Sequence, residues 1–156
     1  MQLRHYQPDD LEALIGLFQA SVNQLTTSYY DAAQREAWAP AVIDRAQWQT
    51  RLASLELLIA EDAQVIAGFI GFSLGGHIDL LYCAPRYTRR GVATALYTAA
   101  ETRLRTVGAH ELFTEASLVA QPFFAGRGFS VQQAQTVMRG AVKVPRMLMH
   151  KILEPR

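Results

Sequence analysis

The sequence predicts a mixed α/β fold, a mostly antiparallel central sheet of about seven strands flanked by about four helices. Three observations predict it. Apolar residues recur at helical spacing in the first third, form short strand-like runs over residues 57–84, and return to helical spacing from residue 89. Turn-forming residues separate the short runs. The 156 residues, 50% hydrophobic and 19% charged, can bury a core without disulfides or metal, so we expect residues 1–156 to form a single domain.

The first third of the chain predicts one strand and two main helices. Residues 2–6 suit a short strand, after which Pro8 and two aspartates favour the first turn of a helix. Asp44 resembles the start of a capping box and predicts a second helix, whereas the stretch 26–40 predicts a loop with a short helix. The first helix has one apolar face, made of Leu11, Leu14, Ile15, Phe18, Val22 and Leu25.

The rest of the chain predicts six strands and two helices. Three short apolar runs predict an antiparallel meander over residues 57–61, 65–74 and 77–84. A long helix follows from residue 89 and ends at Gly108, because glycine is the usual residue just past a helix. The remaining pattern predicts a strand over 111–117, a short helix over 120–125, and strands over 129–137 and 142–153.

Composition narrows the class of protein. Cys83 is the single cysteine, so no intramolecular disulfide is possible and a reducing compartment is expected. The sequence has no Cys/His spacing typical of zinc, so we expect no metal. The amino terminus has no apolar stretch of signal-peptide length, and no run reaches the length of a membrane span. We therefore expect a cytoplasmic protein without a membrane partner.

The charges are divided unevenly along the chain. Residues 1–78 hold four arginines against nine acids (4 − 9 = −5), and residues 79–156 hold eleven basic residues against five acids (11 − 5 = +6). This division indicates that the second half faces an anion, although chance scatter over a solvated surface explains it equally well. The excess is too small and too dispersed to predict a nucleic-acid partner.

The segment from Thr88 to Ala93 predicts an anion site. Gly91 lets the backbone approach a ligand closely, and the unpaired N–H groups of residues 89–94 would converge at the positive end of the helix. Three nearby arginines, at positions 86, 89 and 90, favour a pyrophosphate or phosphate ester. The alternative is a surface arginine pair on an ordinary helix that Thr88 caps. A P-loop would need a lysine after the glycine, and a dinucleotide fingerprint would need three glycines.

The same segment resembles a known family. Thr88-Arg-Arg-Gly-Val-Ala93 is similar to the [Q/R]-x-x-G-x-[G/A] signature of the GNAT superfamily of acyl-CoA-dependent N-acetyltransferases. Leu81-Tyr-Cys-Ala-Pro85 resembles the strand before that signature, and Phe123-Phe-Ala-Gly-Arg-Gly-Phe129 resembles the family's late helix-to-strand junction. The resemblance extends from Leu3 to about Leu153. Within the superfamily, the sequence is most similar to the small bacterial acetyltransferases of the YafP type. It implies a GNAT-like fold and a single acetyltransferase domain.

The resemblance implies acetyl-CoA as cosubstrate and assigns residues to it. Backbone groups of Leu81 and Cys83 would hold the pantetheine arm. Thr88 stands where the family usually has Gln or Arg, and Ser117 where it often has Asn. Phe124 replaces a tyrosine that often protonates the departing thiolate, so that acid is missing and transfer should be slowed rather than abolished. The pyrophosphate would lie on the backbone of Arg89, Arg90, Gly91, Val92, Ala93 and Thr94.

The family mechanism is direct attack of an amine on the thioester, which requires a base that removes a proton from the ammonium. Asp79 is the first choice, because strand alternation places it on the face of Leu81 and Cys83. Glu115 is the reserve candidate. A role for Asp79 in capping a neighbouring loop is an equally good explanation.

The acceptor is expected to be a small-molecule primary amine. Tyr29, Tyr30 and Trp38 lie in the region that resembles the family's acceptor-covering loop, where they would line the acceptor site or fasten the loop to the core. His77 would line the acceptor site or flank a turn. Exposed strands near the carboxyl end are compatible with a homodimer. The alternative function is a non-catalytic acyl-CoA-binding or regulatory module on the same fold, which Phe124 motivates.

Overall fold

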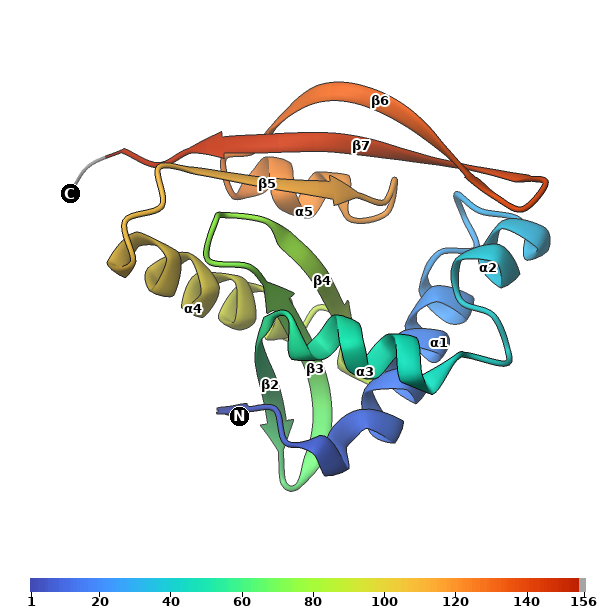
Figure 1. The fold of residues 1–156 in the computed structure, drawn as a ribbon, viewed down its shortest axis with the longest axis horizontal. Helices are drawn as coiled ribbons and strands as arrows, with labels where there is room; N and C mark the ends of the chain where they lie inside the picture. Colours follow the sequence, from blue (N-terminus) through green and yellow to red (C-terminus); the bar gives the residue numbers. More distant parts are fainter. Residues whose placement is uncertain (155–156) are drawn as a thin grey trace.

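The computed structural model describes residues 1–154, which form seven strands in two antiparallel sheets with five α-helices around them (Figure 1). The predicted mixed α/β fold is confirmed, and the alternation of helical and strand periods along the chain is its cause. The elements are β1 (Gln2–His5), α1 (Leu11–Leu25), α2 (Ala32–Trp38), α3 (Arg45–Ala53), β2 (Glu56–Asp62), β3 (Val65–Phe72), β4 (Ile78–Cys83), α4 (Val92–Thr106), β5 (Glu111–Ala116), α5 (Gln121–Gly126), β6 (Ser130–Arg139) and β7 (Val142–Ile152), with short 3-10 turns at Pro8–Asp10 and Pro85–Tyr87.

The first sheet has the order β1-β2-β3-β4 and is covered on both faces. On β3, Phe69 packs with α1 and α3, whereas its neighbour Ile70 packs with α4. Because successive side chains of a strand point to opposite faces, a strand buried on both faces reads as a continuous apolar run. The meander predicted over residues 57–84 is therefore confirmed.

The second sheet has the order β5-β7-β6, with α5 and part of α4 against one face. Phe124 and Phe129 pack edge-to-face at a centroid distance of 5.1 Å, and Met149 of β7 is buried in the same cluster. The sequence predicts a single central sheet; in the structure it is split into two sheets, and the break lies between β4 and β5.

The two sheets meet at one end of β4 and β5 only. There the Phe113 amide donates to the Gly76 carbonyl at 3.0 Å, and the buried Thr114 hydroxyl donates to the Ile78 carbonyl at 2.8 Å. A Cβ at position 76 would lie 2.2 Å from the Glu111 carbonyl oxygen, so only glycine permits this approach. Towards Cys83 the strands are no longer paired with each other, and this separation opens the site described next.

The long helix starts three residues later than predicted. Arg89 and Gly91 have φ angles of 62° and 79°, which lie in the left-handed region and cannot be part of a right-handed helix. These two residues form a tight turn, which directs the first amides of α4 towards the gap between β4 and β5. None of the helices within residues 1–154 has the length and apolar character needed to cross a membrane.

Candidate active site

A cleft with a volume of about 510 Å³ lies between the separated strands, the amino end of α4 and one side of α1. Most of the cofactor-binding residues predicted from the resemblance line it: Leu81, Cys83, Thr88, Arg89, Gly91, Val92, Ala93, Thr94 and Ser117. The structure therefore brings together residues from three separate elements that the sequence assigned to one ligand.

Apart from the Ala93 amide, which points at the Cys83 sulfur, the amino end of α4 presents uncommitted backbone donors to this cleft. Within residues 1–154, no backbone oxygen accepts a hydrogen bond from the amides of residues 89–94. The Thr88 hydroxyl donates to the Pro85 carbonyl at 2.7 Å and so does not cap α4, whose N-cap is Gly91. The alternative of an ordinary helix capped by Thr88 is wrong. Free amides and the helix dipole together favour an anion at this point.

The edge of β4 that faces the cleft is also unpaired. Just past the end of β4, the Ala84 amide donates to the Ala67 carbonyl of β3 at 2.8 Å. Because backbone groups in an antiparallel strand alternate in direction, Tyr82 bonds towards β3, and the N–H and C=O groups of Leu81 and Cys83 point the other way. These groups can bind an extended ligand in the manner of an added strand.

The Cys83 thiol lies beside the end of this edge. Burial raises the pKa of the Cys83 thiol to about 11, and the Ala93 amide, which points at the sulfur, opposes that rise. A thiol with so high a pKa is a poor nucleophile. We therefore interpret the Cys83 side chain as a small residue in the cleft wall, and its backbone groups as the part that can bind a ligand.

Two predicted cofactor residues are not part of the cleft lining. Arg90 lies over the Tyr87 ring, with its guanidinium carbon 5.5 Å from the centroid, outside the lining. Phe124 is 3% exposed and packs in the core, whereas Phe123 faces the cleft. A helix of 6 residues has fewer than two turns, so its period does not determine which of two adjacent phenylalanines faces the ligand.

Asp79 does not lie where strand alternation places it. The pairing of β3 with β4 shifts register between Gly71 and Phe72, so that Asp79 is the unpaired residue of a bulge. Its Oδ1 accepts a hydrogen bond from Arg51 Nη2 of α3 at 2.7 Å. A bulge redirects the side chain at the extra residue, which is why the expected face was wrong.

His77 and Glu115 form a pair across the junction of the sheets. His77 Nε2 lies 2.6 Å from Glu115 Oε2, and the His77 ring stacks on Phe113 with a centroid distance of 4.6 Å and an interplanar angle of 1°. The hydrogen bond to Glu115 raises the pKa of His77, and the same bond lowers the pKa of Glu115. The charge of Asp79 also raises the pKa of His77, so the candidate residues Asp79, His77 and Glu115 lie within electrostatic reach of one another.

The three aromatic residues between positions 29 and 38 have different roles. The buried Tyr30 hydroxyl donates to the Pro145 carbonyl at 2.6 Å and accepts from the Leu118 amide at 2.9 Å, so it ties this segment to the second sheet. Trp38 lines the cleft and also a small neighbouring hollow of about 70 Å³, and its Nε1 donates to Tyr82. Tyr29 is 55% exposed and lies outside both linings.

Comparisons with known proteins agree with this arrangement. The family described as "Acetyltransferase (GNAT) domain" matches residues 21–151. The chain is 36% identical over 142 residues to the uncharacterized N-acetyltransferase YafP of Escherichia coli strain K12, covering 90% of this chain and 89% of that protein. The chain belongs to the GNAT acetyltransferase family. The predicted resemblance, including the likeness to YafP, is confirmed.

Solved structures of the GNAT family match the same fold. A GCN5-related N-acetyltransferase from Rhodopseudomonas palustris, titled "Aminotransferase, Class-II", is 38% identical, with a TM-score of 0.94 over 97% of this chain and 95% of that chain. The PaiA N-acetyltransferase of Thermoplasma acidophilum, solved in complex with coenzyme A, is 21% identical, with a TM-score of 0.76 over 97% of this chain and 98% of that chain. The second likeness concerns the fold alone.

Several cleft residues of this acetyltransferase were not predicted from the sequence. One wall comes from α1 and the residue after it, where Ser21, Val22, Leu25 and Thr26 face the cleft. Tyr82 closes the same side, and burial raises the pKa of its phenol to about 12. These residues carry no local motif, because they become neighbours of the signature segment only through packing.

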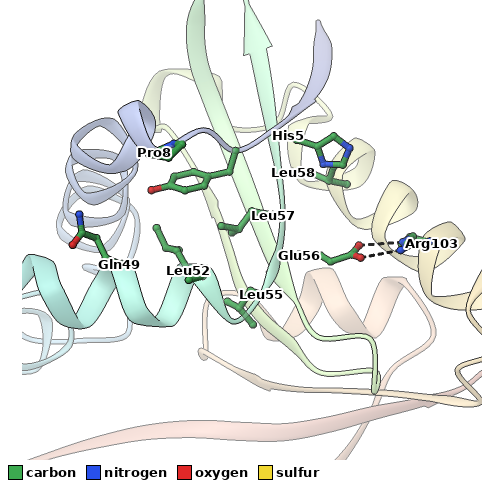
Figure 2. A pocket seen from close by; sticks show the side chains of 11 residues that line it. His5, Pro8, Gln49, Leu52, Leu55, Glu56, Leu57, Leu58 and Arg103 are labelled. Carbon is green, nitrogen blue, oxygen red and sulfur yellow. Dashed lines mark hydrogen bonds and ion pairs between the residues drawn. The ribbon is translucent and has the colours of Figure 1, made fainter.

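A second, wider hollow lies away from this site. Figure 2 shows it between α3, the β1–β2 edge and α4, with a volume of about 880 Å³. Leucines from α3 and β2 form its floor, and an ion pair between Glu56 and Arg103 closes one side at 3.0 Å. It contains none of the residues that the sequence assigned to function. In addition, the described residues 1–154 include no cluster of three or more metal-binding side chains.

Proposed function

We propose that the protein transfers the acetyl group of acetyl-CoA to a primary amine of a small molecule by direct attack on the thioester. The observation that carries this proposal is the cleft with free α4 amides at one end and the unpaired edge of β4 along its side. Acetyl-CoA, when bound, supplies an activated acyl group and a thiol leaving group.

Backbone groups would do most of the binding. The amides of Gly91, Val92 and Thr94 would donate to the diphosphate, and Arg89, which also lines the cleft, would add a full positive charge. The amides of Leu81 and Cys83 would hold the pantetheine arm and donate to the thioester oxygen as it gains negative charge. These groups are held by strand and helix geometry, so they need no rearrangement before reaction.

The His77–Glu115 pair would receive the proton of the amine. Glu115 lies near the end of β5, and Ser117, the residue just past that strand, lines the cleft. Glu115 would accept the hydrogen bond from His77 Nε2, which leaves Nδ1 as the proton acceptor, the arrangement in which a carboxylate orients an imidazole base. Asp79, held by Arg51, would support the charge of the protonated imidazole from a distance.

The departing thiolate would leave without a proton from the aromatic pair. Phe123 and Phe124 carry no acidic hydrogen, and the Tyr82 phenol is buried with a raised pKa. A thiol with a pKa of about 8.5 is an acceptable leaving group as its anion. The absence of an acid at position 124 therefore favours a slower enzyme and is compatible with turnover.

The test is a turnover assay with the full chain. Acetyl-CoA is mixed with a panel of primary amines, and free thiol and the acetylated amine are measured together. The proposal predicts one thiol released for each amide formed, with no acetylated protein. Saturable acetyl-CoA binding without product across the panel would contradict catalysis and support the non-catalytic acyl-CoA-binding alternative.

A further inference from the structure

We infer that the acceptor amine carries an anionic oxyacid group, a carboxylate or a phosphonate, that Arg146 and Arg139 bind. This inference rests on the proposed function and names the substrate class of the same site. It comes from the small hollow beside the cleft, which Tyr30, Trp38, Ser117, Val137, Arg139, Val144, Pro145 and Arg146 line.

The hollow adjoins the acetyl-transfer cleft. Trp38 and Ser117 line both spaces, so a ligand in the hollow meets the cleft at these two side chains. The floor is one face of the β6–β7 hairpin, in which Gln135 pairs with Arg146 and Val137 with Val144. Figure 1 shows α2 close to the tip of this hairpin, and Gln34 Nε2 of α2 donates to the Lys143 carbonyl at 3.0 Å. This bond holds α2, whose Trp38 lines the hollow, against the hairpin that forms the floor.

The same sheet face carries Glu115, the carboxylate that would orient the proposed base His77. Glu115 pairs with Leu148 of β7, two residues from Arg146, so both side chains point to one face as diagonal neighbours. Diagonal neighbours on adjacent strands are roughly 7–8 Å apart. The positive charge of Arg146 also lowers the pKa of Glu115. If the amine of an acceptor lies at the His77–Glu115 pair, a second group that is a few bonds from that amine would reach the Arg146 guanidinium.

The charges of the hollow fit an anion. Both charged residues that line it are arginines. Arg146 uses Nε to donate to Gln135 Oε1 at 3.0 Å, and among residues 1–154 neither arginine has a carboxylate within ion-pair distance. Arg146 is half-buried, and its planar guanidinium matches the two oxygens of a carboxylate or phosphonate. An acceptor with a second positive charge would be repelled at the same place.

The experiment compares acceptors that differ in the anionic group. Amino acids, their carboxamides and the corresponding aminoalkylphosphonates are assayed for kcat/KM with saturating acetyl-CoA, using wild type, Arg146→Met, Arg139→Met and Lys143→Met. The quantity compared is the preference for an anionic acceptor over its carboxamide. Intrinsic differences in amine reactivity cancel when this ratio is compared between variants. Lys143→Met is the matched control, because Lys143 lies on the same strand with its side chain on the opposite, exposed face.

The inference predicts that wild type prefers one anionic series and that Arg146→Met reduces this preference about tenfold to a hundredfold, the value of a charge-assisted hydrogen bond. Arg139→Met should reduce it less, because Arg139 is exposed, and Lys143→Met should leave it unchanged. The favoured series identifies the group as carboxylate or phosphonate. An unchanged preference in both arginine variants, or equal rates for carboxamides in wild type, would overturn the inference while leaving acetyl transfer intact. No turnover with any amine would overturn the proposed function first.

Discussion

The environment of the His77 imidazole determines how its charge varies with pH. The hydrogen bond to Glu115 and the charges of Glu115 and Asp79 raise the pKa of His77 above its ordinary value of 6.5, whereas burial and Arg51 oppose them. An imidazole accepts a proton only when it is neutral. The proposed base is therefore active on the alkaline side of this raised pKa, and Glu115 sets where that side begins.

We predict that kcat/KM rises with pH through a single group with a pKa above 6.5, because the rate follows neutral His77. Glu115→Gln removes the negative charge and should move this rise to lower pH, while His77→Gln should reduce kcat about a hundredfold or more. The measurement is the pH dependence of kcat/KM in each variant. Asp79→Asn is the control, since it removes a partly exposed ion pair and should change the rate at the plateau by only a few-fold.

A rise that stays in place in Glu115→Gln would show that the pair has a structural role only. A large loss of rate at every pH in Asp79→Asn, with an unchanged profile in Glu115→Gln, would instead restore Asp79 as the base. Both results are distinguishable from unfolding, because neither requires a change in the affinity for acetyl-CoA.

The sequence predicted which residue types meet at this point but could not predict their partners. Asp79, His77 and Glu115 were all candidates, yet Arg51 and Asp79 are 28 residues apart in the chain and His77 and Glu115 are 38 apart. The bulge in β4 was also invisible, because one extra residue changes the face of a side chain without changing the apolar pattern. Long-range pairing of this kind comes from the fold.

The start of α4 is the element whose function was most visible in the sequence. A glycine before a helical period, with arginines beside it, predicts free amides, and the structure has them at Gly91, Val92 and Thr94 without the Thr88 cap that was the alternative. Two details were predicted wrongly: the first residue of α4, and which of Phe123 and Phe124 faces the cleft. A turn with positive φ angles and a helix of fewer than two turns are too short for periodicity to locate.

Gly91 provides a test of this element. Gly91→Glu places bulk and negative charge where the diphosphate would lie, so we predict at least about a tenfold weaker affinity for acetyl-CoA. Gly91 has a φ of 79°, so any side chain here also strains the backbone, by about 1 kcal/mol of unfolding free energy. Titration of the variant with acetyl-CoA, together with a denaturant melt, separates the two effects.

Gly108 supplies the matched control for that variant. It has a φ of 85° at the other end of α4, and an added Cβ there, as at Gly91, meets nothing within 4 Å. Gly108→Glu should therefore lose a similar amount of stability and bind acetyl-CoA as wild type does. If both variants bind equally well, the α4 amides are not the diphosphate site.

At the scale of the whole molecule, contacts outside the cleft hold the two sheets at a fixed separation. The sheets join directly near Gly76 and Phe113, and Tyr30 ties the segment before α2 to β7 on one side. On the other side Glu101 of α4 accepts from Tyr97 and from Lys151 of β7, each at 2.6 Å. The cleft is thus formed before a ligand arrives, and binding requires little ordering of the chain.

The central claim is that this preformed cleft binds acetyl-CoA, and its most direct test is thermal unfolding with and without the ligand. A ligand at a hundred times its Kd stabilises the folded state by about 2.7 kcal/mol, which corresponds to a rise in Tm of about 5 to 10 °C for a chain of this size. We predict this rise for wild type and a much smaller one for Gly91→Glu at the same concentration. An unchanged Tm in wild type at millimolar acetyl-CoA, or an equal rise in both proteins, would contradict it.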